Sequence, residues 1–311
     1  MRVLVTGGAG FIGSHIVDAL LDGGHEVAVL DNLSTGKREN VPERARFYQV
    51  DLRDREATHR ALADFSPEAV SHQAAQASVA VSVREPHLDA EVNVMGGINL
   101  LDAAVAAGAS QVVFASTGGA IYGEVPEGKR AEETWAPSPL SPYAISKLSI
   151  ELLLEVYRKH KGLEATVLRY ANVYGPRQDP YGEAGVVAVF FDLARRGEAL
   201  RVNARRESGD AGCVRDYVYV GDVARMNVLA LEGKLRDRVL NVASGSETTT
   251  LALASAIIAR VENPAATVTY AAPRAGDLER SVLNPALAER ALGSLTELTA
   301  GLAATHAYYT R

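Results

Sequence analysis

Short apolar runs alternate with longer segments of helical periodicity along the first half of the chain. The short runs predict buried strands at Val3–Val5, Glu26–Leu30, Arg46–Val50, Ala69–His72, Gln111–Ala115 and Ala165–Arg169. The longer segments predict helices at Phe11–Leu21, Pro86–Ala107 and Pro142–Lys161. Because strands and helices alternate in this way, we expect an α/β fold whose parallel sheet is doubly wound, with helices on both faces.

The pattern changes after Tyr174, where residues 175–182 are rich in glycine and proline and predict a loop. Later segments predict three helices and a strand that returns to the sheet: Asp222–Glu232, Val239–Val242, Thr250–Val261 and Pro285–Leu292. No single linker separates the two patterns, so we expect two interleaved domains. The larger comprises residues 1–174 with a returning segment at about 218–243, and a smaller C-terminal α/β domain comprises residues 175–217 and 244–311.

Apolar residues make up 47% and charged residues 23% of the sequence, the balance of an ordinary globular protein. The formal net charge of −6 leaves no broad basic field, which argues against nucleic acids and anionic membranes as partners. The single cysteine, Cys213, excludes an internal disulfide and a thiolate metal cage, and the histidines lack metal-ligand spacing. No apolar run suits a signal peptide or a membrane span, so we expect a soluble cytoplasmic protein without a metal site.

A glycine-rich turn follows the first predicted strand directly and opens the first helix. Its glycines recur at every third position, which allows a tight turn and a close approach of the backbone to a pyrophosphate at the helix N-terminus. The turn therefore predicts a Rossmann-type dinucleotide site, with contacts from Gly7, Gly10, Phe11, Ile12 and Gly13.

Asp31 ends the second predicted strand, where a carboxylate accepts hydrogen bonds from both ribose hydroxyls of the dinucleotide. Since a carboxylate there repels a 2′-phosphate, Asp31 predicts NAD rather than NADP. Lys37 and Arg38 follow in the loop and would weaken this preference if they faced the cofactor rather than solvent. The predicted site also includes Asn32, Asp51 and Leu52, of which the last two would contact the adenine edge or merely cap a loop.

Tyr143 and Lys147 stand four residues apart within a predicted helix, so that their side chains share one helix face. An ammonium group beside a phenol stabilises the phenolate. Such a phenolate takes a proton from a hydroxyl while a nicotinamide takes a hydride from the same carbon. A tyrosine on a helix face is by itself typical of a core, but beside a dinucleotide site the pair predicts a catalytic centre.

With these motifs the chain resembles the extended short-chain dehydrogenase/reductase superfamily and, within it, the UDP-glucose 4-epimerase group. Besides Gly7–Gly13 and Tyr143–Lys147, the resemblance rests on Asp31–Ser34, His72–Gln76, Asn93, Tyr122–Gly123, Arg169–Pro176, Gly182–Val186, Arg215–Val218 and Pro273–Asp277. The resemblance covers nearly the whole chain and implies reversible hydride transfer between C4 of a UDP-hexose and tightly held NAD, through a 4-keto sugar.

The resemblance implies that Tyr143 is the base and that Lys147 tunes it and binds the nicotinamide ribose. It also implies that a Ser or Thr at the end of the fifth strand bridges the substrate hydroxyl. Counting back four residues from Tyr122 gives Gly118, which has no hydroxyl, whereas counting along the strand gives Thr117. We predict Thr117, and Ser116 is the alternative.

The residues after this hydroxyl discriminate among the superfamily's activities. Sugar-nucleotide 4,6-dehydratases place Asp-Glu just after the Thr, and decarboxylating relatives place a Glu there. This chain has Gly118, Gly119 and Ala120, none of which titrates. Return of the hydride to C4 is then the remaining path, which favours an epimerase. The resemblance further implies that Asn93 belongs to the cofactor site and supports Lys147 through backbone or water contacts.

On the substrate side, the resemblance implies that Asn172, Arg215 and Arg274 hold the diphosphate and hexose and that Asp277 orients a ribose hydroxyl. Ser281 would flank the sugar; it either leaves room for a 2-acetamido group or is an ordinary serine beside a helix.

The resemblance also implies a homodimer through the helices at 86–107 and 143–161, whose apolar faces suit it. The alternative functions are a UDP-N-acetylglucosamine 4-epimerase, a net oxidoreductase or reductase on a nucleotide sugar that exchanges its dinucleotide with solvent, and a catalytically inactive NAD-binding regulator.

Overall fold

A computed structural model describes residues 1–181, 185–274 and 276–310. The chain forms two compact units, each assembled from separate segments. Unit 1 comprises Met1–Thr117, Pro139–Arg169 and Val223–Leu240, and unit 2 comprises Gly118–Ser138, Tyr170–Asp222 and Asn241–Arg311. Segments 118–138 and 170–174 thus group with unit 2, whereas the division inferred from the sequence assigned them to the larger domain.

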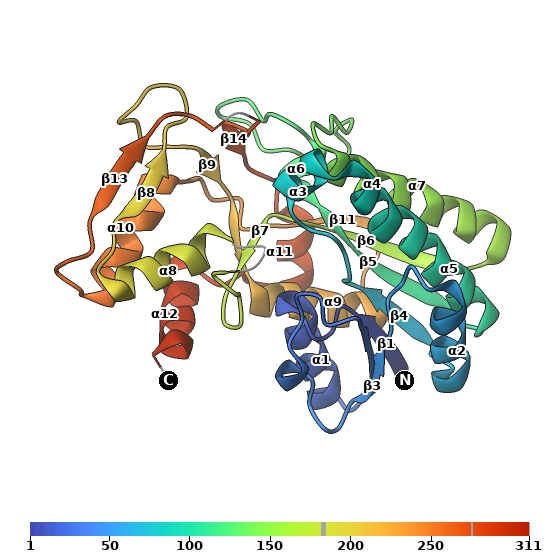
Figure 1. Ribbon diagram of the computed structural model, residues 1–311. Helices are drawn as coiled ribbons and strands as arrows, with labels where there is room; N and C mark the ends of the chain where they lie inside the picture. Colours follow the sequence, from blue (N-terminus) through green and yellow to red (C-terminus); the bar gives the residue numbers. More distant parts are fainter. Residues whose placement is uncertain (182–184, 275, 311) are drawn as a thin grey trace. The chain divides into compact units, whose positions relative to one another are not determined.

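The main sheet has seven strands in the order β11-β6-β5-β4-β1-β2-β3 (Figure 1). Its strands are β1 (Arg2–Thr6), β2 (Glu26–Asp31), β3 (Arg46–Gln49), β4 (Ala69–His72), β5 (Gln111–Thr117), β6 (Glu164–Tyr170) and β11 (Val239–Val242). The pairs β1–β2, β1–β4, β2–β3 and β4–β5 are parallel. The predicted α/β class and parallel Rossmann-type sheet are therefore confirmed, and every predicted strand is present.

Helices cover both faces of this sheet, with α1 and α9 on one face and α2, α5 and α7 on the other (Figure 1). Unit 1 holds α1 (Phe11–Asp22), η1 (Arg38–Asn40), α2 (Arg55–Phe65), α3 (Val79–Arg84), α4 (Pro86–Asp89), η2 (Ala90–Met95), α5 (Gly96–Ala106), α7 (Pro142–Lys161) and most of α9 (Val220–Leu231). The predicted helix at Pro86–Ala107 is three successive elements, because the turns of η2 are π-helical. The apolar core between sheet and helices includes Leu4, Leu62, Leu100, Phe114 and Ile150.

Local signals set the bounds of α7. The Ser141 hydroxyl accepts a hydrogen bond from the backbone N–H of Ala144, and Pro142 occupies the first helical position. At the other end, Gly162 adopts a left-handed conformation with φ of 69°, which glycine accommodates without steric cost. The predicted and observed bounds of this helix coincide for these reasons.

Unit 2 has its own core, which includes Tyr174, Phe191, Leu253, Ile257 and Leu302. Its small sheets pair β7 (Asn172–Tyr174) with β10 (Tyr217–Tyr219), β8 (Leu200–Asn203) with β13 (Val268–Ala271), and β9 (Val214–Arg215) with both β12 (Thr248–Thr249) and β14 (Arg280–Ser281). Its helices are α6 (Gly118–Ile121), α8 (Val186–Arg196), α10 (Thr250–Val261), α11 (Ala286–Leu292) and α12 (Leu298–Tyr309).

His72 ends β4 and is packed inside unit 1. Its Nδ1 shares a hydrogen bond of 2.8 Å with the Thr6 hydroxyl, and its ring lies 5.5 Å from that of Phe114. Burial, with a smaller contribution from the positive charge of Lys147, lowers the pKa of His72 to about 3. The imidazole is therefore neutral in the folded protein at physiological pH.

This depressed pKa predicts a loss of stability in mild acid. The unfolded chain binds a proton at His72 below its ordinary pKa near 6.5, whereas the folded protein does not until about pH 3. This part of the stability is therefore present above pH 6.5 and is lost as the pH falls toward 3. We expect His72→Asn, which does not titrate, to remove about 2 kcal/mol of the decrease in unfolding free energy between pH 7 and pH 5. Urea denaturation of both proteins measures this; an identical pH dependence in the two would contradict it.

Candidate active site

The backbone of the glycine-rich turn between β1 and α1 is packed so closely that a Cβ would not fit at Gly7 or Gly13. Gly7 has a φ of 66°, and a Cβ there would lie 2.7 Å from the backbone nitrogen of Ala74. A Cβ on Gly13 would lie 2.1 Å from the carbonyl oxygen of Gly7. Gly10 caps α1 without a side-chain hydrogen bond, so the first N–H groups of the helix, beside Phe11 and Ile12, have no capping side chain. This backbone suits a pyrophosphate.

Asp31 joins the end of β2 to this turn. Its Oδ2 accepts a hydrogen bond of 3.0 Å from the backbone N–H of Ala9, and its Oδ1 accepts one of 2.8 Å from that of Leu33. Burial raises the pKa of the Asp31 carboxyl, and the two backbone donors act against that rise. The carboxylate therefore lies at the end of β2 and against the glycine-rich turn.

The side chains of the loop residues next to Asp31 also contact other residues of unit 1. Arg38, whose charge would favour NADP if it faced the cofactor, lies over the Phe47 ring at 4.8 Å and donates to the Val41 carbonyl oxygen. The Asn32 amide donates to the Asp51 carboxylate at 2.9 Å. Hydrogen bonds from Arg53 hold the pKa of Asp51 well below its usual range. The adjoining Leu52 is buried, and its carbonyl oxygen accepts from Asn99.

Tyr143 and Lys147 lie together on the face of α7 that meets β5. The Lys147 side chain is buried, and its Nζ donates a hydrogen bond of 2.9 Å to the carbonyl oxygen of Ala115. The same Nζ lies 4.9 Å from the centre of the Phe114 ring and 5.9 Å from that of Tyr143. The ammonium group is therefore held between the end of β5 and the phenol.

The two candidate hydroxyls at the end of β5 have different surroundings. The Ser116 hydroxyl donates to Glu151 Oε1, and the Glu151 carboxylate also pairs with Arg169 of β6. No hydrogen bond joins the Thr117 hydroxyl to another residue that the structure describes. No role was predicted from the sequence for Glu151, although it follows Lys147 by one further helical step of four residues. Arg169 was predicted only as part of the motif Arg169–Pro176.

Asn93 lies in the π-helical turns of η2 and is buried. Its amide donates to the Gln76 carbonyl oxygen, to Asp89 and to the Ser146 hydroxyl, and its Oδ1 accepts from the backbone N–H of Gln76. Ser146 adjoins Lys147 in the chain, so Asn93 contacts the neighbour of the lysine.

Two of the predicted substrate residues come together in unit 2. The backbone N–H and the amide of Asn172 both donate to the carbonyl oxygen of Asp216, the residue after Arg215. Arg215 is half-buried and is the register partner of Ser281. Ser281 is buried in β14, and its hydroxyl donates to the carbonyl oxygen of Gly119 in α6 at 3.2 Å.

Asp216 was predicted only as part of the motif Arg215–Val218, and in the structure it binds several backbone groups of unit 2. Its buried carboxylate accepts from the backbone N–H groups of Ser244, Gly245 and Leu283, and from the Ser244 hydroxyl. Arg274 and Asp277 are exposed, and the Asp277 backbone N–H donates to the Arg274 carbonyl oxygen. Residues 182–184 and residue 275, which belong to stretches that carry the resemblance, lie outside the described residues.

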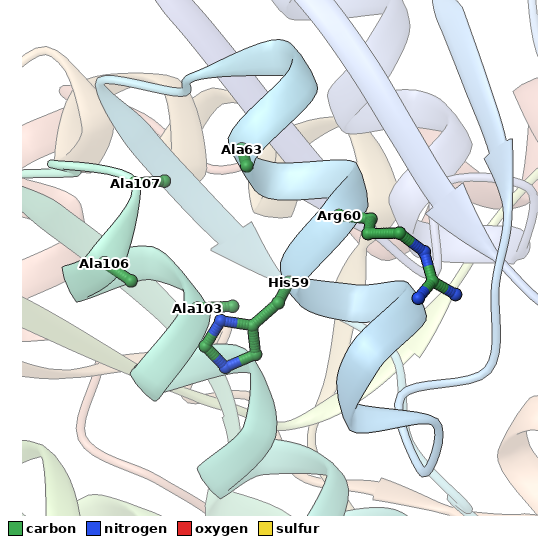
Figure 2. A pocket seen from close by; sticks show the side chains of 6 residues that line it. All are labelled: His59, Arg60, Ala63, Ala103, Ala106 and Ala107. Atoms are coloured by element: carbon green, nitrogen blue, oxygen red, sulfur yellow. The ribbon is translucent and has the colours of Figure 1, made fainter.

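A hollow of about 250 Å³ lies between α2 and α5 (Figure 2). It is lined by His59, Arg60, Ala63, Ala103, Ala106 and Ala107, and the His59 ring points toward Ala103. None of the predicted site residues lines it, so it is separate from the candidate site. Within residues 1–181, 185–274 and 276–310, no helix is both long and apolar enough to span a membrane.

Comparison with known proteins identifies the family. The pattern of the NAD dependent epimerase/dehydratase family matches residues 3–243. The UDP-glucose 4-epimerase of Mycolicibacterium smegmatis is 43% identical over 298 residues, which cover 94% of this chain and 93% of that protein. The crystal structure of the Thermus thermophilus UDP-glucose 4-epimerase complex with NAD is 55% identical, with a TM-score of 0.95 over 100% of this chain and 99% of that one. The Thermotoga maritima UDP-glucose 4-epimerase with UDP-glucose is 46% identical, with a TM-score of 0.92 over the same shares. This chain therefore belongs to the NAD dependent epimerase/dehydratase family.

Proposed function

We propose that this protein is a UDP-glucose 4-epimerase, which interconverts UDP-galactose and UDP-glucose through a 4-keto intermediate. One observation carries the proposal: the buried Lys147 ammonium is held at the end of β5, within 5.9 Å of the centre of the Tyr143 ring. The similarity to named UDP-glucose 4-epimerases over nearly the whole chain supports the same conclusion.

The residues of unit 1 fit NAD. The first N–H groups of α1 have no capping side chain, which leaves donors for a pyrophosphate at the glycine-rich turn. Asp31 presents a carboxylate beside this turn, and a carboxylate has lone pairs for ribose hydroxyls in addition to its two backbone donors. Bound NAD supplies the hydride acceptor and donor for C4 of the sugar.

In this mechanism Tyr143 acts as the base. Its phenolate takes the proton of the sugar 4-hydroxyl and later returns it to the 4-keto oxygen. Lys147 stabilises the phenolate, because a nearby positive charge favours the ionised form of a phenol. The Thr117 hydroxyl bridges the substrate hydroxyl and the Tyr143 oxygen. Thr117 suits this role better than Ser116, whose hydroxyl is already bound to Glu151.

The segment that follows Thr117 favours epimerisation over elimination. Residues 118–121 form α6 and carry no titratable side chain, and the Gly119 carbonyl oxygen accepts a hydrogen bond from Ser281. Loss of water from the sugar needs an acid and a base beside it, and this segment supplies neither. The 4-keto sugar is then reduced again at C4.

We assign substrate binding to Asn172, Arg215, Arg274 and Asp277 of unit 2. Guanidinium groups match the oxygens of a diphosphate, and Asn172 is held beside Arg215 by its two bonds to the Asp216 carbonyl oxygen. Ser281, paired in register with Arg215, would flank the sugar. Its small side chain favours a second candidate function, the 4-epimerisation of UDP-N-acetylhexosamines. Conversion of UDP-N-acetylgalactosamine by the purified protein would support this function, and conversion of UDP-galactose alone would contradict it.

The purified protein, incubated with UDP-galactose and no added cofactor, is expected to form UDP-glucose. Tyr143→Phe removes the base and should lower kcat by about 10²–10⁴-fold while NAD stays bound. Tyr157→Phe is the matched control, because this tyrosine of the same helix bonds to Asp102; it should keep wild-type activity. Activity of Tyr143→Phe within a few fold of wild type would contradict the assignment. Release of free NADH would indicate a net oxidoreductase that oxidises the sugar, and no turnover at all would indicate an inactive regulator.

The carboxylate of Asp31 predicts which dinucleotide the protein carries. We expect NAD⁺ to remain bound through purification, because a 2′-phosphate beside this carboxylate would be repelled. Denaturing the protein and assaying the released dinucleotide measures this directly. Recovery of mainly NADP⁺ would mean that Lys37 or Arg38 governs the site.

We also propose a cytoplasmic homodimer. The stripe on α7 formed by Ile145, Leu152 and Val156 is exposed, although the opposite face of α7 is buried against the core. Val79 and Val83 of α3 and Met95 of η2 add further exposed apolar groups in unit 1. A helix that is apolar on two faces is typical of an element covered on both, and a second copy of the same stripe would cover it.

Light scattering after gel filtration tests the dimer. The wild type should have twice the mass of one chain, and Leu152→Glu should shift it toward the monomer by burying an unpaired charge at the interface. Tyr270→Glu, at an exposed aromatic residue of unit 2, is the control and should leave the mass unchanged. A monomeric wild type, or a dimer that tolerates Leu152→Glu, would contradict the proposal.

A further inference from the structure

We propose that Glu151 is a positioning residue for the Thr117 hydroxyl. Its carboxylate ties Ser116 at the end of β5 to Arg169 of β6, and so fixes the end of β5 against the face of α7 that carries Tyr143 and Lys147. The inference rests on the proposed function, because it concerns the geometry of the same catalytic centre.

The three side chains form a buried set of contacts. Glu151 Oε1 accepts from the Ser116 hydroxyl and, at 3.0 Å, from Arg169 Nε. Glu151 Oε2 accepts from Arg169 Nη2 at 2.6 Å, so that the guanidinium binds both carboxylate oxygens. Ser116, Glu151 and Arg169 are 3%, 8% and 5% exposed. A two-point contact between guanidinium and carboxylate fixes orientation as well as distance.

Spacing along α7 links this set to the catalytic pair. Tyr143, Lys147 and Glu151 follow one another at intervals of four residues, so they occupy one helix face. Lys147 binds the Ala115 carbonyl oxygen, and Glu151 binds the side chain of Ser116. Two consecutive residues of β5 are therefore held by the helix that carries Tyr143. Since only φ and ψ are soft in the backbone, holding residues 115 and 116 leaves Thr117 little freedom.

The energetics of a buried ion pair agree with a geometric role. Removing two charges from water is costly, and apolar residues of similar volume often stabilise a fold as well or better. The pair is directional, however, because the guanidinium and the carboxylate meet at two points. It is also costly to break, because either partner alone would be a buried, uncompensated charge. In this protein the Glu151 carboxylate of the pair also binds Ser116, the residue before Thr117.

Ser116→Ala tests the link, because it removes the contact to β5 and leaves the ion pair of Glu151 and Arg169 intact. We expect kcat for UDP-galactose epimerisation to fall about tenfold, with KM and bound NAD unchanged, because a misplaced catalytic hydroxyl slows the chemical step. Ser110→Ala, just before the first residue of the same strand, is the matched control; its hydroxyl bonds to the Glu68 carbonyl oxygen and its loss should leave kcat unchanged.

A double-mutant cycle separates positioning from a general structural role. If Glu151 and Ser116 act through Thr117, then Ser116→Ala should lower kcat in the wild-type background but not in a Thr117→Ala background. An equal fall in both backgrounds, an unchanged kcat in Ser116→Ala, or an effect confined to KM or NAD content would each overturn the inference. A wild-type enzyme that does not convert UDP-galactose would contradict the proposed function and, with it, this inference. An active wild type with additive variants would contradict the inference alone.

Discussion

The hydrogen bond from the Lys147 ammonium to the Ala115 carbonyl oxygen is the contact on which the candidate catalytic centre depends. An ammonium group in the interior costs several kcal/mol unless polar partners compensate it, so a shift of α7 along β5 would cost this buried charge one of its hydrogen bonds. The rings of Phe114 and Tyr143 lie close to the same ammonium group, and the His72 imidazole, whose ring lies 5.5 Å from that of Phe114, remains neutral. One buried charge thus fixes a helix to a strand, and the residues on both sides of that contact, Tyr143 and Thr117, are the ones to which we assign the chemistry.

Unit 2 uses a buried charge in a comparable way. The Asp216 carboxylate draws together the backbone of Ser244, Gly245 and Leu283, while its own backbone binds Asn172 and the Ser281 carbonyl oxygen. Of the side chains assigned to substrate, Asn172 and Arg215 therefore project from short strands, β7 and β9, that adjoin Asp216 rather than from a large sheet. Such short strands share few backbone hydrogen bonds, so the contacts of Asp216 contribute much of the stability of this arrangement.

Periodicity and caps predicted the elements that position the cofactor, because the strands are buried apolar runs and α7 is bounded by Ser141 and Gly162. Helix α2 was missed because its sequence is largely polar, although Asp54 caps it and signals its start. The π-helical turns of η2 have no sequence signal distinct from an α-helix. The roles of Glu151 and Asp216 depend on partners far along the chain, at Ser116, Arg169 and Ser244, so spacing alone could not reveal them. For Ser281, the sequence suggested a residue beside the sugar but not that its hydroxyl binds Gly119.

If the proposed mechanism holds, the hydrogen removed from C4 of the sugar returns to the same carbon of the same molecule. UDP-galactose labelled with deuterium at C4 reveals its fate in one experiment, with the product analysed by mass spectrometry and NMR. UDP-glucose is expected to retain the deuterium at C4, in ordinary water and without added cofactor. Loss of the label to solvent, or its transfer to free NADH, would show that the hydride does not return to C4.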